Sequence, residues 1–199
     1  IEFLAGKKYR ENMAAFEVIA DHIKGAVMIM GDDKGIVPDN NDQGYIVRRL
    51  IRRAIRQGRL LGISQESWTK EIAKIAFHDY QQAYPELRRN ADFVITQIKE
   101  EEAKFMKTLE KGERQISGRE IDGRAAFNLF QTFGYPVEMT KEIASERGMP
   151  LSSAFEAEYA EAAHDHQQLS RTASAGKFKG GLADNSEAVT RLHTAAHLM

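Results

Sequence analysis

The chain of 199 residues contains no cysteine, which excludes disulfides and thiolate metal sites. It has only four prolines, and no apolar run approaches the roughly 20 residues that span a membrane. The first residues lack the pattern of a secretory signal peptide, so we expect a cytoplasmic protein with no membrane partner. Because the formal net charge is only −1, any binding to a polyanion must come from a local basic patch.

Long apolar patterns with a 3.6-residue period predict an all-α protein, a bundle-like body with one long helix. The expected helices cover residues 9–30, 44–61, 64–83, 86–115, 122–133, 136–148 and 152–170. Glycine and serine then become frequent, which is typical of a linker. We therefore expect a helical domain over residues 1–171, and a linker with a truncated helix over 172–199. Because the chain starts with Ile1 and stops inside that helix, we expect a piece of a longer protein.

The helix expected over residues 44–61 has two contrasting faces. One is an apolar stripe that should pack into the core, made of Tyr45, Ile46, Leu50, Ile51, Ala54 and Ile55. The other carries six arginines and no acid: Arg48, Arg49, Arg52, Arg53, Arg56 and Arg59. Guanidinium groups match the geometry of phosphate, so an outward arginine face predicts contact with nucleic acid. The alternative is internal pairing with acids of the long helix, such as Glu100, Glu101 and Glu102, although the charged run at 99–104 is typical of a solvated face.

A turn with two asparagines precedes this helix. Asn40 and Asn41 stand just before Gly44, and asparagine favours turns and left-handed backbone, so a purely structural loop is one interpretation. The other is that an amide held on a turn beside a basic helix hydrogen-bonds the edge of a base. The local sequence leaves both open.

His193 and His197 are four residues apart on the last expected helix. That spacing places both imidazoles on one face, where they can share a metal ion. The chain has no cysteine or later histidine to complete the site, so we expect an empty half-site. A metal-dependent hydrolase fragment built on these histidines is an alternative that zinc analysis would test.

Several segments, taken in order, resemble the tRNA-recognition region of bacterial alanyl-tRNA synthetases. They are FEVIADHIKGAV (16–27), IVPDNNDQGYIVRRLIRRAIRQGRLLG (36–62), YPEL (84–87), EEEAKFMKTLEKG (100–112) and AAFNLFQTFGYPVEMTKEIASERG (125–148). Residues 192–199, LHTAAHLM, look like the first metal-binding helix of that family's editing domain. The resemblance therefore covers nearly the whole chain.

The resemblance implies an alanine–tRNA ligase that charges tRNA(Ala) with alanine, using ATP and Mg²⁺ in a class II catalytic domain. IEFLAGKKY (1–9) is similar to the segment that follows that domain, so we expect this piece alone to be inactive and to hold no cofactor. The family's editing domain binds Zn²⁺ through the two histidines and two later ligands. The implied partner is the acceptor stem of tRNA(Ala), not DNA.

In the family, an Asn and an Asp read a G·U pair of the acceptor stem from opposite grooves. Asn40 matches that Asn, although Asp39 replaces the usual serine before it. Gln131 stands where the Asp is expected, in the stretch FQTFG (130–134). A carboxylate only accepts hydrogen bonds, whereas an amide also donates, so Gln131 implies an altered contact or a different identity pair. We expect base contacts from Asn40 and Gln131, and phosphate contacts from the arginine helix: Arg48, Arg49, Arg52, Arg53 and Arg56.

A second class of function is a helical interaction module that docks an acidic protein through the arginine helix. Competition distinguishes the two: an RNA hairpin should displace an RNA ligand, whereas an acidic protein should not.

Overall fold

The computed structural model describes residues 1–116 and 120–175. Within them the regular secondary structure is helical, with one isolated parallel bridge between Ile121 and Leu151. The predicted all-α class is therefore confirmed. The last expected helix, with His193 and His197, lies outside the described residues.

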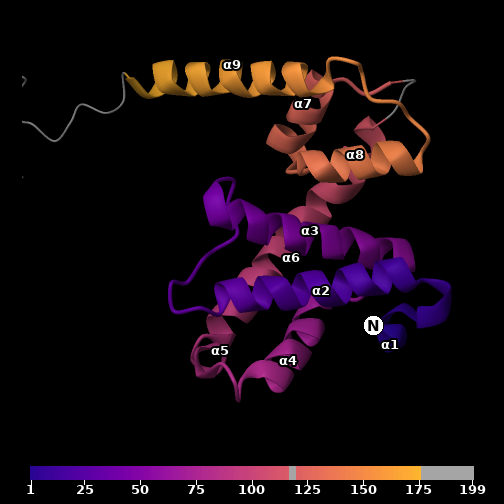
Figure 1. Cartoon of the computed structure of the whole chain (residues 1–199), viewed down its shortest axis with the longest axis vertical. Coiled ribbons are helices and arrows are strands. Elements are labelled where there is room, and N and C mark those ends of the chain that lie inside the picture. The colour runs from indigo at the N-terminus through magenta and orange to yellow at the C-terminus, as the bar shows by residue number, and fades with distance from the viewer. Residues whose placement is uncertain (117–119, 176–199) are drawn as a thin grey trace, which may run out of the picture.

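The described helices follow one another along the chain, and the segment 31–41 connects α2 to α3. They are α1 (Glu2–Ala5), a 3-10 turn (Tyr9–Glu11), α2 (Met13–Met30), α3 (Asp42–Leu61), α4 (Thr69–Tyr80), α5 (Pro85–Arg89), α6 (Ala91–Gln115), α7 (Gly123–Phe133), α8 (Val137–Glu146) and α9 (Phe155–Ala175). Helices α2 and α3 lie side by side, and the long α6 passes behind them, from α5 at one end to α7 at the other (Figure 1). Helix α9 packs against α7 and extends away from the body (Figure 1).

The core lies between α2, α3, α4 and α6 and continues between α6, α7 and α8. Its fully buried side chains include Ile19 and Ile23 of α2, Ile51 and Ile55 of α3, and Ile98, Phe105 and Leu109 of α6. Each such side chain stabilises the fold by about 1.5–3 kcal/mol relative to an exposed position. The predicted inward stripe of α3 is confirmed at Ile51, Ala54 and Ile55 but is wrong at Ile46, which is 42% exposed.

Some predicted helix ends differ from the observed ones, and each difference has a local cause. The single helix expected over 86–115 is two, because the Asn90 side chain turns back and donates to Gly31 O at 3.0 Å. Helix α4 begins at Thr69 and not near Ser64, because Glu102 of α6 accepts from the Thr69 backbone N–H at 3.1 Å and so replaces a local cap.

Helix α7 matches its prediction closely. The Asp122 side chain accepts from the Ala125 N–H at 2.7 Å, which caps the start of the helix. Gly134 ends it in the left-handed conformation, with φ 70°.

Candidate nucleic-acid interface

The arginines of α3 do not form a single outward row. Arg52 and Arg56 are only 7% and 3% exposed, so the expected outward face is wrong for these two. The cause lies in α6 and α8, which pack carboxylates against this face of α3. The alternative of internal pairing with acids of the long helix is thus confirmed for this part of α3.

Arg52 is one of the two buried arginines of α3. Its Nε lies 2.5 Å from Oε1 of Glu101, and its guanidinium covers the Phe105 ring at 4.9 Å from the centroid. It also donates from Nη1 to Gly134 O at the end of α7. Burial lowers the pKa of the Arg52 guanidinium from its ordinary value, opposed by the charge of Glu101. Arg52 therefore joins α3 to both α6 and α7.

Arg56 lies one turn further along and is held by two carboxylates. Its two terminal nitrogens donate to Glu146 of α8 at 3.0 and 2.5 Å, and its Nε lies 3.4 Å from Glu113 of α6. Burial acts to lower the pKa of Arg56, but the hydrogen bonds and charge of Glu146 outweigh it, so that pKa is raised. This bidentate pair fixes α8 against α3.

Arg49 and Arg53 have a different environment. Arg49 pairs with Glu138 at 2.7 Å and Arg53 with Glu142 at 2.7 Å, and the two arginine side chains are 37% and 36% exposed. Ion pairs this exposed contribute only about 0–1 kcal/mol to stability. Their guanidinium groups can therefore exchange a carboxylate for a phosphate at small cost.

The charged run at 99–104 is solvated at Lys99, Glu100 and Lys104, as the sequence predicts, but not at its two central glutamates. Glu101 and Glu102 are 2% and 4% exposed. Glu101 binds Arg52, and Glu102 accepts from the N–H and hydroxyl of Thr69. A signal was present in the spacing, because the two glutamates continue the buried stripe of α6, which comprises Val94, Ile98, Glu101, Glu102, Phe105 and Leu109.

The Asn40 turn is fixed against the first turns of α3. The Asp39 N–H donates to Gly44 O at 3.0 Å, and Arg48 Nη2 donates to Pro38 O at 3.1 Å. A Cβ on Gly44 would lie 2.7 Å from the Cβ of Asp39, so only glycine allows this approach. The left-handed residue of the turn is Asp42, with φ 47°, and neither asparagine adopts that conformation.

The side chain of Asn40 has a defined orientation. It is exposed, and its Oδ1 accepts a hydrogen bond from Arg48 Nη1. A guanidinium has donors only, so the atom that contacts it must be the carbonyl oxygen of the amide. The Asn40 NH₂ group is left with two donors that no other described residue engages. Those donors can meet acceptors on a ligand.

Gln131 lies on the last turn of α7. Its side chain is exposed and makes no hydrogen bond within the described residues. The preceding Phe130 meets the ring of Tyr45 edge-on, with centroids 6.1 Å apart, and the Tyr45 hydroxyl donates to Glu138 at 3.0 Å. The start of α3, beside Asn40, is thus joined to the helix that carries Gln131.

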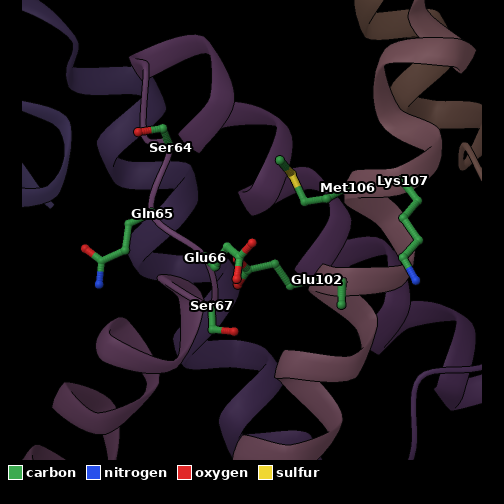
Figure 2. Close-up of a pocket in the computed structure, with 8 residues that line it drawn as sticks. Ser64, Gln65, Glu66, Ser67, Glu102, Met106 and Lys107 are labelled. Atoms are coloured by element: carbon green, nitrogen blue, oxygen red, sulfur yellow. The ribbon is translucent and has the colours of Figure 1, made fainter.

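A pocket on another side of α6 does not suit an anionic ligand. It is lined by Ser64, Gln65, Glu66, Ser67, Glu102, Met106 and Lys107, between the α3–α4 connection and α6 (Figure 2). The carboxylates of Glu66 and Glu102 lie near the centre of the view, and Lys107, which also lines the pocket, points away from them (Figure 2). The candidate interface is therefore the region of Asn40, α3 and α7.

The described residues contain neither a cluster of metal-binding side chains nor a membrane-spanning helix. Across 1–116 and 120–175, no three or more His, Asp or Glu side chains gather as a metal site would require. None of the helices in those ranges has the length and apolarity to cross a membrane.

Comparison with known proteins shows that the chain is similar to class II tRNA synthetases, among them alanine–tRNA ligases. The family model of tRNA synthetases class II (A) matches residues 1–198. Alanine–tRNA ligase of Borreliella afzelii is 39% identical over 209 residues, covering 100% of this chain and 34% of that protein. Alanine–tRNA ligase of Treponema denticola is 41% identical over 216 residues, covering 100% of the chain and 35% of that protein. The chain thus spans about a third of the length of these curated relatives.

Proposed function

Because the chain belongs to the family of class II (A) tRNA synthetases, we propose that it is the acceptor-stem recognition region of an alanine–tRNA ligase. The whole enzyme would charge tRNA(Ala) with alanine in the cytoplasm, using ATP and Mg²⁺. This region would bind the RNA and recognise one base pair through hydrogen bonds. The observation that carries the proposal is the exposed Asn40 amide, held by Arg48 beside a helix with half-exposed arginines.

The orientation of Asn40 suits the major groove of an RNA stem. A G·U pair presents there the O6 and N7 of guanine and the O4 of uracil, all of which are acceptors. The Asn40 NH₂ group supplies donors, because its carbonyl oxygen is occupied by Arg48. We assign Asn40 to contact these acceptors.

Gln131 takes the second base contact in this proposal. Its carbonyl oxygen can accept from the exocyclic amine of guanine in the minor groove. It is exposed, and its amide is not engaged by any described residue. Because it has no charge, we expect its hydrogen bond to be weaker than that of an aspartate.

The phosphate contacts divide according to burial. Arg49 and Arg53 are half-exposed. Arg49 pairs with the exposed Glu138, and Arg53 pairs with the partly exposed Glu142 and contacts His22 Nε2 at 3.1 Å, so both keep solvent-facing donors and we assign them to phosphates. Arg48, with an 18% exposed side chain, holds the turn and reaches the same surface. The sequence-based prediction also assigns Arg52 and Arg56 to phosphates. Because both are buried, we propose instead that they stabilise the packing beneath the interface.

The editing function stays a proposal for the longer protein. His193 and His197 would supply two of its Zn²⁺ ligands, and both lie outside the described residues. Of the whole enzyme's cofactors, we propose that none binds residues 1–175.

Binding of an acceptor-stem hairpin to the 199-residue chain tests this function. The hairpins differ in one base pair, G·U or G·C, and affinity is measured from low to high salt. We expect tighter binding of the G·U hairpin, and affinity that falls by about 0.9 log units per log unit of salt for each phosphate neutralised. Equal affinity for both hairpins together with a flat salt response would overturn the proposal, and competition by an acidic protein in place of RNA would favour an interaction module.

A further inference from the structure

One buried carboxylate lies between the two segments that carry the proposed base contacts. Glu101 of α6 is 2% exposed. Its Oε1 lies 2.5 Å from Arg52 Nε and 3.5 Å from Arg48 Nε. Arg48 and Arg52 are one turn apart on α3, where two like charges repel each other. The single Glu101 carboxylate offsets this repulsion, because it lies within ion-pair distance of both guanidinium groups and is hydrogen-bonded to that of Arg52.

Each of the two arginines then reaches a different segment. Arg48 donates to Pro38 O at 3.1 Å and to the side-chain oxygen of Asn40. Arg52 donates to Gly134 O, at the residue that ends α7 three positions after Gln131. Glu101 is therefore connected to Asn40 through Arg48, and through Arg52 to Gly134 at the end of the helix that carries Gln131.

We infer that Glu101 is a positioning residue that sets the spacing between the Asn40 amide and the end of α7 that carries Gln131. This inference rests on the proposed function, because it concerns how the two base contacts are held. Two side chains that approach one base pair from opposite grooves must keep a fixed separation, and such sites tolerate errors of only about 0.5 Å. A buried ion-pair network supplies that rigidity where flexible surface side chains do not.

The adjacent Glu102 provides a matched control. It is also buried, at 4% exposed, and it lies on the same helix. Its carboxylate binds Thr69 of α4 and none of the arginines of α3. Loss of charge at Glu102 therefore perturbs α6 packing without touching the link to Asn40 or Gly134.

The experiment compares the affinities of the 199-residue chain for the G·U and G·C hairpins, expressed as a ratio. The variants are Asn40→Ala, Glu101→Gln, Arg48→Lys and Glu102→Gln, each with its thermal unfolding curve. Lysine at position 48 keeps one positive charge but lacks the fork that reaches both Pro38 O and Asn40. It serves as the second variant if Glu101→Gln does not fold.

We expect Asn40→Ala, Glu101→Gln and Arg48→Lys each to lower the G·U to G·C ratio at least about fivefold, the smallest loss that a specific base contact gives. The G·C affinity should change less than the ratio, and Glu102→Gln should keep the wild-type ratio. If Asn40→Ala keeps that ratio, the base contact of the proposed function fails. If Asn40→Ala lowers it while folded Glu101→Gln or Arg48→Lys does not, or if Glu102→Gln lowers it equally, the role of Glu101 is overturned.

Discussion

Two pairs of arginines on the same helix occupy opposite environments. Arg52 and Arg56 are 7% and 3% exposed and pair with carboxylates of α6 and α8. Arg49 and Arg53 pair with α8 as well, but their side chains are 37% and 36% exposed. The same residue type thus serves as internal support in one pair and as a candidate ligand contact in the other.

This difference shows why an arginine-rich helix is not by itself a phosphate-binding surface. A buried guanidinium must keep its partners, because an unpaired charge in the interior is costly. A half-exposed one is already solvated on one side and can change partners. Whether an arginine belongs to the support or to the interface depends on the helix that covers it, which here is α6 for Arg52.

The largest expected effect is a loss of stability when a buried arginine of α3 is replaced. Replacing Arg52 with methionine leaves the carboxylate of Glu101 buried without its closest partner. We expect the free energy of unfolding in urea to fall by about 3–5 kcal/mol. Arg49→Met, the matched exposed variant, should change it by less than about 1 kcal/mol. Equal losses in the two variants would remove the distinction between the pairs.

A second variant acts on Arg52 through its neighbour. Gly134 has a left-handed backbone, and a Cβ there would collide with the Arg52 guanidinium. We expect Gly134→Ala to cost about 1–2 kcal/mol from the backbone and a further about 1–3 kcal/mol from displacement of packed atoms. Gly148→Ala is the control, since Gly148 is also left-handed but has no atom within 4 Å of its Cβ position. Urea unfolding should show a larger loss for Gly134→Ala, and similar losses would mean that Arg52 moves aside freely.

The exposed pair should show its effect in RNA binding. We expect Arg49→Gln and Arg53→Gln each to reduce the slope of log affinity against log salt by about 0.9, because each removes one phosphate contact. Their stability should stay within about 1 kcal/mol of wild type. The slope is measured by fluorescence anisotropy with a labelled hairpin. A slope that Arg49→Gln and Arg53→Gln leave unchanged would exclude these two residues from the interface.

The smallest expected effect concerns pH. The hydrogen bonds from Arg56 lower the pKa of Glu146 below its ordinary value of 4.5. A lowered pKa means that the folded state favours the carboxylate, so this stabilisation is present above pH 4.5 and is lost as the pH falls through the lowered pKa. The difference in unfolding free energy between wild type and Glu146→Gln should therefore shrink below pH 4.5. Urea unfolding at several pH values from 7 to 3 measures it, and a difference that grows with acidity would contradict the pairing.

The sequence predicts the helices well where local signals are complete. Helix α7 has a capping Asp122 and a terminating Gly134, and both ends match. The break at Asn90 has no such signal, because it depends on Gly31, a residue that is distant in the chain. Likewise α4 starts at Thr69 through a contact with Glu102.

The candidate site was also predictable only in part, because some of its features depend on contacts between distant segments. The exposure of Asn40 and Gln131 fits their expected roles, although their contacts with RNA stay predictions. The burial of Arg52 and Arg56 could not be read from α3 alone, because it arises from α6 and α8. Glu101 follows the apolar period of α6, and this spacing predicts its burial. Its charge favours a solvated position instead, so the prediction from the sequence alone is wrong at this residue.

Photo-crosslinking to the G·U hairpin tests the location of the RNA most directly. A photoreactive side chain is placed at Gln43, next to the Asn40 turn, or at Ile75 of α4, which is 55% exposed. We predict a crosslink from position 43, which competing unlabelled hairpin abolishes, and none from position 75. A crosslink from position 75 with none from position 43 would place the RNA elsewhere and contradict the proposed interface.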